Sequence, residues 1–290
     1  MQLRTLLSLF FSFSMAACFA QEDTLNYLFL GHTYQWKSAV QKVDFRLEAI
    51  DKSPYDQFWL GGDNCSETAQ SYTTLQYLDS IFHLANPKNH WTLGNHDHRN
   101  GNMEWIEEFT QRNDYYTSHQ DGITVMVLNT NLNPSDCENL NKQYQMISNV
   151  CDTIQESSHL IILNHHFIWS KLPEISPQEI GSHGVIEYYA MNCDSTNALF
   201  HNTMYPKLIS VQERGVQVIN IMGDAGWGDP TAKQTSEGIW FMASGINATV
   251  YDDNPVAFEA SADEILVIRH IPKQKKLWWE YLSLDELYEE

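Results

Sequence analysis

The chain has 290 residues, of which 43% are hydrophobic and 12% aromatic, enough for one large domain or two small ones with a sizeable core. This composition excludes a disordered or low-complexity chain. Its 17 basic and 37 acidic residues give a formal net charge of -20. We therefore expect no nucleic acid or anionic membrane as partner, because phosphate-rich partners need Lys and Arg to replace their counterions.

Residues 1–20 have the size and order of a secretory signal peptide. Arg4 is followed by an apolar run from Leu6 to Ala20, which is too short to span a bilayer comfortably. Cleavage after Ala20 would leave a mature domain of residues 21–290, exported to the periplasm or secreted. Alternatively, the stretch ending in Cys18 resembles a bacterial lipobox, and a lipid on Cys18 would anchor the protein at the cell envelope. No later run is long enough to predict an integral membrane span.

Short β-rich apolar runs predict nine strands. In chain order they cover residues 27–30, 58–60, 91–93, 123–128, 160–163, 216–222, 239–243, 265–268 and 277–282. Helical spacing of apolar residues predicts helices within 40–50, 75–82, 144–154 and 199–211. The early part alternates strand and helix and the last third is mostly strand, which indicates one α/β domain with mixed sheets.

Residues 168–197 show no clear period and contain Pro173, Pro177, Gly181 and Gly184. We interpret them as a long ordered loop between two core strands, which is either a lid over a binding site or a plain surface excursion. Two interpretations of the cysteines also stay open. Cys137 and Cys151 could form a disulfide across a short loop in an oxidising compartment, or the cysteines that follow the signal could all be free thiols.

Five of the predicted strands run into short polar segments that begin with Gly or Asn. The segments are Gly31-His32, Gly61-Gly62-Asp63, Gly94-Asn95-His96-Asp97, Asn164-His165-His166 and Gly223-Asp224. Because the carboxyl ends of parallel strands share one edge of a sheet, we expect these side chains to meet there. A single Asp after a strand is usually a helix cap, but several polar segments at strand ends favour a site. Carboxylate, amide and imidazole donors without a thiolate suit Zn, Mn or Fe.

The order of these segments resembles that of the calcineurin-like metallophosphoesterase superfamily. The resemblance spans Tyr27 to Ala225, and Gly94-Asn95-His96-Asp97 is its most specific element. It implies a four-layer αββα sandwich of mixed β-sheets flanked by helices, with a metal centre at the strand ends. It also implies hydrolysis of a small phosphate mono- or diester by a metal-bound hydroxide, with one or two divalent ions as cofactor.

The resemblance implies roles by position. Asp63 would bridge two ions, while Asn95 and His165 would bind the second ion. His96 would protonate the leaving oxygen, and Asp97 would orient the His96 ring. His166 and Tyr34 are assigned to substrate binding.

The sequence departs from the family pattern at both ends. The first motif, Asp-x-His, is His32-Thr33-Tyr34 here, and the last, Gly-His-x-His, is Gly223-Asp224-Ala225-Gly226. We therefore expect Asp224 as a ligand in place of a His, His32 as a ligand of the altered first ion, and no ligand from Gly226. Trp227 and Asp229 could rebuild that pocket. Three functions stay open: a phosphoesterase with a modified centre, a single-metal hydrolase or transferase, and a non-catalytic descendant that binds a ligand or partner at the old site.

Overall fold

The computed structural model describes residues 24–35, 41–169, 172, 174–175, 200–226, 230–246 and 263–289. The predicted signal peptide, Cys18, Trp227, Asp229 and most of the predicted loop at 168–197 lie outside the described residues. Among the described residues, no helix has the length and apolar character needed to cross a membrane.

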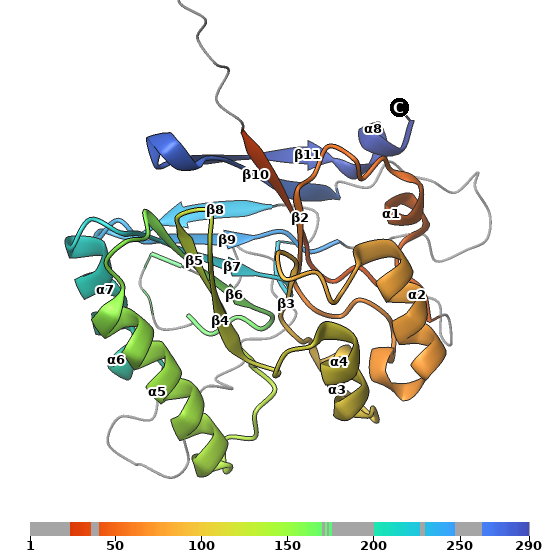
Figure 1. Cartoon of the computed structure of the whole chain (residues 1–290), viewed down its shortest axis with the longest axis horizontal. Helices are drawn as coiled ribbons and strands as arrows, with labels where there is room; N and C mark the ends of the chain where they lie inside the picture. The colour runs from red at the N-terminus through yellow and green to blue at the C-terminus, as the bar shows by residue number, and fades with distance from the viewer. Residues whose placement is uncertain are drawn as a thin grey trace, which may run out of the picture.

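Two mixed β-sheets form the centre of the fold (Figure 1). The first sheet has the order β11 (Lys276–Ser283), β10 (Glu264–Ile271), β1 (Leu25–Leu30), β2 (Gln57–Leu60) and β3 (His90–Trp91). The second has the order β4 (Tyr116–Gln120), β5 (Ile123–Val127), β6 (His159–Asn164), β7 (Gln217–Met222), β9 (Trp240–Ala243) and β8 (Thr231–Gln234). Strands β1 to β3 are parallel, as are β5, β6, β7 and β9, whereas β10, β4 and β8 run antiparallel to their neighbours.

Helices cover the outer faces of both sheets. The first sheet carries α1 (Phe45–Ala49), α2 (Tyr72–Phe82), α4 (Met103–Thr110) and α8 (Leu284–Glu289), with the short α3 (Asn95–His98) after β3. The second carries α5 (Cys137–Thr153) and α7 (Tyr205–Glu213), the latter preceded by α6 (Phe200–Thr203). Figure 1 shows α5 and α7 on one side of the molecule and α1, α2 and α4 on the other.

Three separate apolar cores correspond to the three spaces between four layers. One core joins α5 and α7 to the second sheet, for example through Ile147, Leu208 and Ile162. Another joins α2 and its neighbours to the first sheet, for example through Leu78 and Leu28. The third lies between the sheets and includes Trp59 facing residues such as Ile161. The predicted αββα arrangement of two mixed sheets flanked by helices is therefore confirmed.

Most elements lie where the sequence predicts them, and the differences have local causes. The strands β4 and β8 were not predicted, because both are sheet edges with polar, partly exposed sequences. The first predicted helix is shorter than the range 40–50, because Val43 pairs with Tyr34 in a β-bridge and Asp44 caps α1. The expected Cys137–Cys151 disulfide is wrong, since Cys151 and Cys65 are free thiols while Cys137 is disulfide-bonded, which also rules out four free thiols.

The buried Arg46 ties the C-terminal helix to the first sheet. Its guanidinium lies 2.9 Å from the Asp44 carboxylate, 2.6 Å from Asp263 before β10 and 2.7 Å from Asp285 in α8. Arg46 is fully buried, so each of its N–H groups needs such a partner. The sequence alone predicts a solvated helix at the acidic end of the chain. In the structure this helix is instead held against Arg46 through Asp285.

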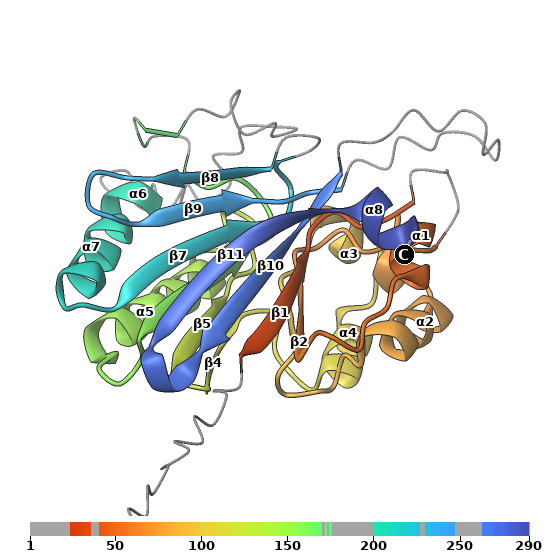
Figure 2. The ribbon, with the colours of Figure 1, turned by 90° about the horizontal axis from the view of Figure 1, so that it is seen from above.

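The two sheets come into backbone contact at the carboxyl ends of their parallel strands. Gly31 after β1 pairs in parallel with Gly245 after β9, and the Ile246 amide donates to the Gly31 carbonyl at 3.0 Å. On the other flank, the Thr92 hydroxyl donates to the Leu128 carbonyl at 2.7 Å. Figure 2 shows this sandwich from above. The polar segments that follow β1, β2, β3, β6 and β7 therefore share one edge of the sandwich.

A buried histidine at the opposite end of the strands predicts a pH dependence of stability. Burial, with the nearby Arg112 charge, lowers the pKa of His90 to about 3 from an ordinary 6.5. The unfolded chain therefore takes up this proton below about pH 6.5 and the folded chain does not. His90 favours folding above that pH and loses this contribution as the pH falls toward 3.

We expect urea unfolding at pH 7 and pH 5 to reveal this effect. In the wild-type protein the unfolding free energy should fall from pH 7 to pH 5. In His90→Gln this fall should be smaller by roughly 2 kcal/mol, because a pKa difference of one unit corresponds to about 1.4 kcal/mol. His119→Gln, at an exposed histidine of β4, is the control and should behave like the wild type. An unchanged pH dependence in His90→Gln would contradict the prediction.

Candidate metal centre

Five side chains from four of the polar segments converge at the shared edge of the sandwich. Within the residues that the structure describes, two groups of three could hold a metal ion: His165, His166 and Asp224, and His32, Asp63 and Asp224. In each group the ligand atoms lie within 4.8 Å of one another, and all five residues are buried. We call these five residues the donor cluster. Both sheets contribute to it, through β1 and β2 on one side and β6 and β7 on the other.

His165 lies at the middle of the donor cluster and is the most informative member. Its Nδ1 lies 2.7 Å from the Gly61 carbonyl oxygen, which requires a proton on Nδ1 and, in the neutral ring, leaves the lone pair on Nε2. The Nε2 atom is fully buried, has no hydrogen-bond partner, and lies 3.4 Å from Asp63 Oδ2 and 3.9 Å from Asp224 Oδ1. A carbonyl that holds one imidazole nitrogen while the other faces carboxylates is the arrangement of a metal-binding histidine.

The other two histidines of the donor cluster are held in a similar way. His32 Nδ1 lies 3.1 Å from the Ile246 carbonyl, and its Nε2 lies 3.9 Å from Asp63 Oδ2. His166 Nδ1 lies 2.7 Å from the Thr130 hydroxyl, and its Nε2 lies 3.3 Å from Asn95 Oδ1. The structure thus brings Asn95 to the cluster through His166. It also places His166, expected at the substrate, among the candidate ligands.

The carboxylates of the donor cluster perturb the protonation of their neighbours. Burial alone would lower the pKa of His165, but the Asp63 and Asp224 carboxylates raise it to about 10. Burial raises the pKa of Asp224 to about 6, while the nearby histidines hold the pKa of Asp63 below its usual range despite its burial. A proton on His165 therefore offsets part of the buried negative charge, and a divalent cation would displace it.

Two members of the donor cluster adopt backbone conformations that are uncommon for residues other than glycine. His32 has φ 51° and Asp63 has φ 53°, both in the left-handed region. The His32 amide donates to the Gly62 carbonyl at 2.9 Å, and the Tyr34 amide donates to the Asp63 carbonyl at 3.1 Å. These bonds link the segments after β1 and β2, and they hold both side chains toward His165.

His96 and Tyr34 border the donor cluster on the side of α3. The Tyr34 ring stacks on the His96 ring with centroids 4.7 Å apart and contacts the His32 ring at the same distance. His96 Nδ1 lies 2.6 Å from the Ser66 carbonyl, and its Nε2 lies 3.5 Å from the exposed Arg99 guanidinium. The ring therefore keeps Nε2 toward solvent and toward a positive charge.

Asp97 has a role in the structure that the resemblance does not imply. Its buried carboxylate accepts from the backbone amides of Asp63, Asn64 and Gly94 at 2.7, 3.0 and 3.0 Å, and also from the Thr68 and Trp91 side chains. None of these groups is the His96 ring, which the Ser66 carbonyl holds instead. The carboxylate fastens the segment after β2 to the segment after β3. Among the described residues Asp97 thus positions backbone amides, and its expected role toward His96 stays a prediction.

Gly226 supplies no ligand, as expected, and the structure explains why a glycine lies there. Its φ of 81° is in the left-handed region, and a Cβ would lie 2.5 Å from the Ala243 carbonyl oxygen. A histidine at this position would need a different backbone path.

Thr130 was missed by the sequence interpretation, although the same pattern indicates it. It follows the predicted strand at 123–128 by two residues, and its hydroxyl also accepts from the His166 amide at 3.2 Å. Treating the end of that strand like the other five would have identified it. Arg99 and the carbonyls of Ser66, Gly61 and Ile246 carry no such signal. Trp169 belongs to the core of the second sheet and donates to Asn220.

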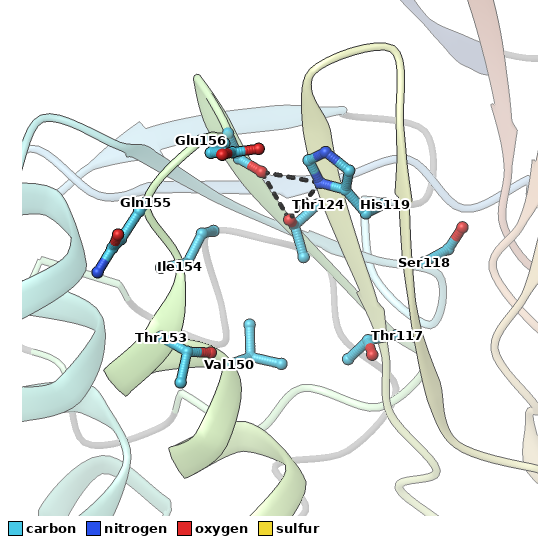
Figure 3. Close-up of a pocket in the computed structure, with 10 residues that line it drawn as sticks. Thr117, Ser118, His119, Thr124, Val150, Thr153, Ile154, Gln155 and Glu156 are labelled. Carbon is cyan, nitrogen blue, oxygen red and sulfur yellow. Dashed lines mark hydrogen bonds between the residues drawn. The ribbon is translucent and has the colours of Figure 1, made fainter.

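A cavity of about 530 Å³ lies away from the donor cluster, at the amino ends of β5 and β6 (Figure 3). His119 Nδ1 lies 3.2 Å from both the Thr124 and Ser157 hydroxyls, which are 2.7 Å from each other. These three groups satisfy one another, and the cavity lies at the opposite end of the strands from the donor cluster. We therefore do not assign the candidate site to it.

The amide-binding role of Asp97 has a testable consequence. Asp97→Asn places an N–H group among backbone donors, so we expect the unfolding free energy to fall by at least about 3 kcal/mol, as for other broken buried networks. Asp152→Asn, at a carboxylate with a 64% exposed side chain, is the control. Urea denaturation measures both variants. Full stability of Asp97→Asn together with a loss of activity would instead support a partner role toward His96.

No protein-family model and no curated protein matches the sequence. Among solved structures, the chain is similar to phosphopantetheinyl hydrolase from Mycobacterium tuberculosis, with 12% identity, a TM-score of 0.43, and coverage of 81% of this chain and 93% of that chain. It is also similar to Vps29 from Entamoeba histolytica complexed with Zn²⁺, with 9% identity, a TM-score of 0.31, and coverage of 90% and 99%. Vps29 from Chaetomium thermophilum has 10% identity, a TM-score of 0.32, and coverage of 89% and 97%. Similarity at this level does not decide an activity.

Proposed function

We propose that the protein is a metal-dependent phosphoester hydrolase, related to the calcineurin-like metallophosphoesterases that its motifs resemble. The observation that carries the proposal is the donor cluster, in which three anchored imidazoles face two carboxylates. The cluster lies beside Asn95 and His96, at the edge where the resemblance places the centre.

The donor cluster fits a divalent ion by its chemistry and by its one orphaned atom. Imidazole and carboxylate donors without a thiolate suit Zn, Mn or Fe. The buried His165 Nε2 has no hydrogen-bond partner, which costs free energy unless another ligand satisfies it. When bound, such an ion holds phosphoryl oxygens and makes water a better nucleophile near neutral pH.

We assign the shared position of the centre to Asp224. It belongs to both groups of three, with His32 and Asp63 on one side and His165 and His166 on the other. This assignment stands beside the role that the resemblance gives to Asp63, whose Oδ2 lies 3.4 Å from His165 Nε2 and 3.9 Å from His32 Nε2. It supports two ions, because the altered first motif still delivers His32 to the cluster.

His96 is the residue best placed to donate a proton to the departing alcohol. In the hydrolysis, water oxygen bonds to phosphorus, the phosphorus–oxygen bond to the alcohol breaks, and the alcohol oxygen takes a proton. The Ser66 carbonyl occupies the Nδ1 side of His96, so a proton for the alcohol would have to be carried on Nε2, the atom that accepts from the Arg99 guanidinium in this structure. Arg99 beside Nε2 adds positive charge for an anionic substrate in a chain whose net charge is -20.

A non-catalytic descendant that binds a ligand or partner at the same cluster is the second candidate. Gly226 favours it, because the position of the last family histidine has no side chain. Bound metal without turnover of any phosphate mono- or diester would support this candidate over the first.

We also propose that the protein is exported, on the basis of the apolar segment at residues 1–20. The intact mass of the protein from the native cell envelope tests this. We expect either the loss of residues 1–20 or a chain that begins at a lipid-modified Cys18. A full-length chain in the cytoplasm would contradict export.

Metal analysis tests the centre directly. We expect the purified protein to hold one or two equivalents of Zn, Mn or Fe. In His165→Gln, the dissociation constant for Zn²⁺ should rise by at least ~100-fold, because a central ligand is lost. Calorimetric titration measures the affinity, and mass spectrometry measures the metal content. His98→Gln, on the exposed end of α3, is the control. Equal affinity in His165→Gln and the wild type would place the ion elsewhere.

Kinetics test the acid. In His96→Ala, kcat for an alkyl phosphate should fall by at least ~100-fold through loss of proton donation, while the metal content stays unchanged. For an aryl phosphate, whose leaving group needs less protonation, kcat of His96→Ala should fall by a smaller factor. A normal rate of the variant with both substrates would remove His96 from the mechanism.

A further inference from the structure

A cavity of about 290 Å³ opens at the same edge of the second sheet as the donor cluster. Its lining includes Tyr115, directly before β4, and Asn129, shortly after β5. Because β4 runs antiparallel to β5, Tyr116 pairs with Val127 at the carboxyl end of β5. The cavity is therefore at the carboxyl ends of the parallel strands, unlike the larger cavity near His119.

Two short segments connect the cavity to the donor cluster, although none of the described residues belongs to both. Asn129 in the cavity wall is followed by Thr130, whose hydroxyl lies 2.7 Å from His166 Nδ1. His98 in the cavity wall ends α3, the helix that begins with Asn95 and His96. We expect the alcohol part of an ester bound at the donor cluster to extend along α3 toward this cavity.

The lining of the cavity is rich in groups that both donate and accept hydrogen bonds. It contains the amide of Asn113 and the phenol of Tyr115, with Leu132 as an apolar wall. The amides of Asn129 and Asn139 also line it, but they bond to Asp114, to the Asn131 amide and to Asp136. Amides and phenols complement hydroxyl groups, which also donate and accept. The buried Asn129 amide donates to Asp114 at 2.6 Å, which fixes the orientation of this wall.

The charges around the cavity disfavour a second anion. Glu107 and Asp114 line it, and the cation of Lys142 is 2.7 Å from Glu138. Among the lining residues that the structure describes, no Lys or Arg is therefore left unpaired for a second phosphate group. The volume is also at the lower limit of the roughly 300–1,000 Å³ of drug-sized ligand sites, so it suits one small ring.

We propose that this cavity binds the alcohol part of the substrate, and that this part is a neutral polyhydroxylated group such as a single sugar or polyol. The kinetic test of this inference rests on the proposed function, because it requires the protein to hydrolyse phosphate esters. It selects sugar monophosphates over sugar bisphosphates and over esters whose alcohol has no further hydroxyl group.

Substrate comparison tests the inference with the metal-loaded wild-type protein. We expect kcat/KM for glucose 6-phosphate to exceed that for fructose 1,6-bisphosphate by at least ~10-fold, given the repulsion by Glu107 and Asp114. In Asn113→Leu and Tyr115→Phe, KM for glucose 6-phosphate should rise by roughly 5- to 10-fold per lost hydrogen bond. KM for phenyl phosphate should change by less than about 2-fold, since its alcohol makes no such bonds.

Asn149→Leu, at an exposed asparagine of α5 outside the cavity, is the matched control and should behave like the wild type. Equal changes for both substrates in the cavity variants, or none for either, would overturn the inference. So would a preference for the bisphosphate.

A binding measurement separates this inference from the proposed function. Calorimetric titration with glucose 6-phosphate does not require turnover. Binding that Asn113→Leu weakens, in a protein that hydrolyses no ester, would contradict the hydrolase and retain the cavity as a sugar site. Hydrolysis of phenyl phosphate without any difference between Asn113→Leu and the wild type toward glucose 6-phosphate would retain the hydrolase and overturn the cavity assignment.

Discussion

The close approach of three glycine backbones holds the two sheets together at the edge that carries the site. Gly31, Gly61 and Gly223 follow β1, β2 and β7, and a Cβ on Gly223 would lie 1.9 Å from the Gly61 carbonyl oxygen. A Cβ on Gly31 would lie 2.6 Å from the Gly223 Cα. A side chain on Gly31 or Gly223 would separate the sheets, because the atoms it would meet are backbone atoms rather than flexible side chains. His32, Asp63 and Asp224 each follow one of these glycines closely, so this contact sets how near they lie to one another.

The buried Asp97 carboxylate stabilises the turns that follow β2 and β3 beside these glycines. Asp97 satisfies the amides of Asp63, Asn64 and Gly94, which the tight turns after β2 and β3 would otherwise leave without partners. Its network offsets the left-handed conformations of His32 and Asp63, which cost on the order of 1–3 kcal/mol each. A fold that maintains such conformations at one cluster has the features of a preorganised site, in which charges of one sign are held close before a ligand arrives.

The two segments that differ from the motifs of the resembled superfamily acquire a physical meaning in three dimensions. Read position by position, Gly226 removes a ligand and Asp224 replaces a histidine with a shorter, charged donor. In the structure the Asp224 carboxylate reaches both groups of the donor cluster, and His32 restores an imidazole opposite Asp63. Added negative charge at Asp224 favours cation binding, and it raises the pKa of His165 together with Asp63. The departures therefore change how the donor atoms are distributed without removing them.

The sequence by itself determined an α/β domain with mixed sheets and the identity of most candidate donors, while the four-layer order was implied by the resemblance of the polar segments to the metallophosphoesterases. Apolar runs of strand length indicate buried strands, and the polar segments that follow them mark the carboxyl ends of those strands. These two features were enough to predict that Asp63, His165 and Asp224 lie at one edge. It did not reveal β4 or β8, whose pairing partners rather than their own polar residues make them strands. Only the tertiary structure decided which atoms face each other. The anchoring of His166 by Thr130, of His165 by Gly61 and of His96 by Ser66 joins residues 30 to 104 positions apart, and the role of Asp97 depends on amides whose direction is set by that packing.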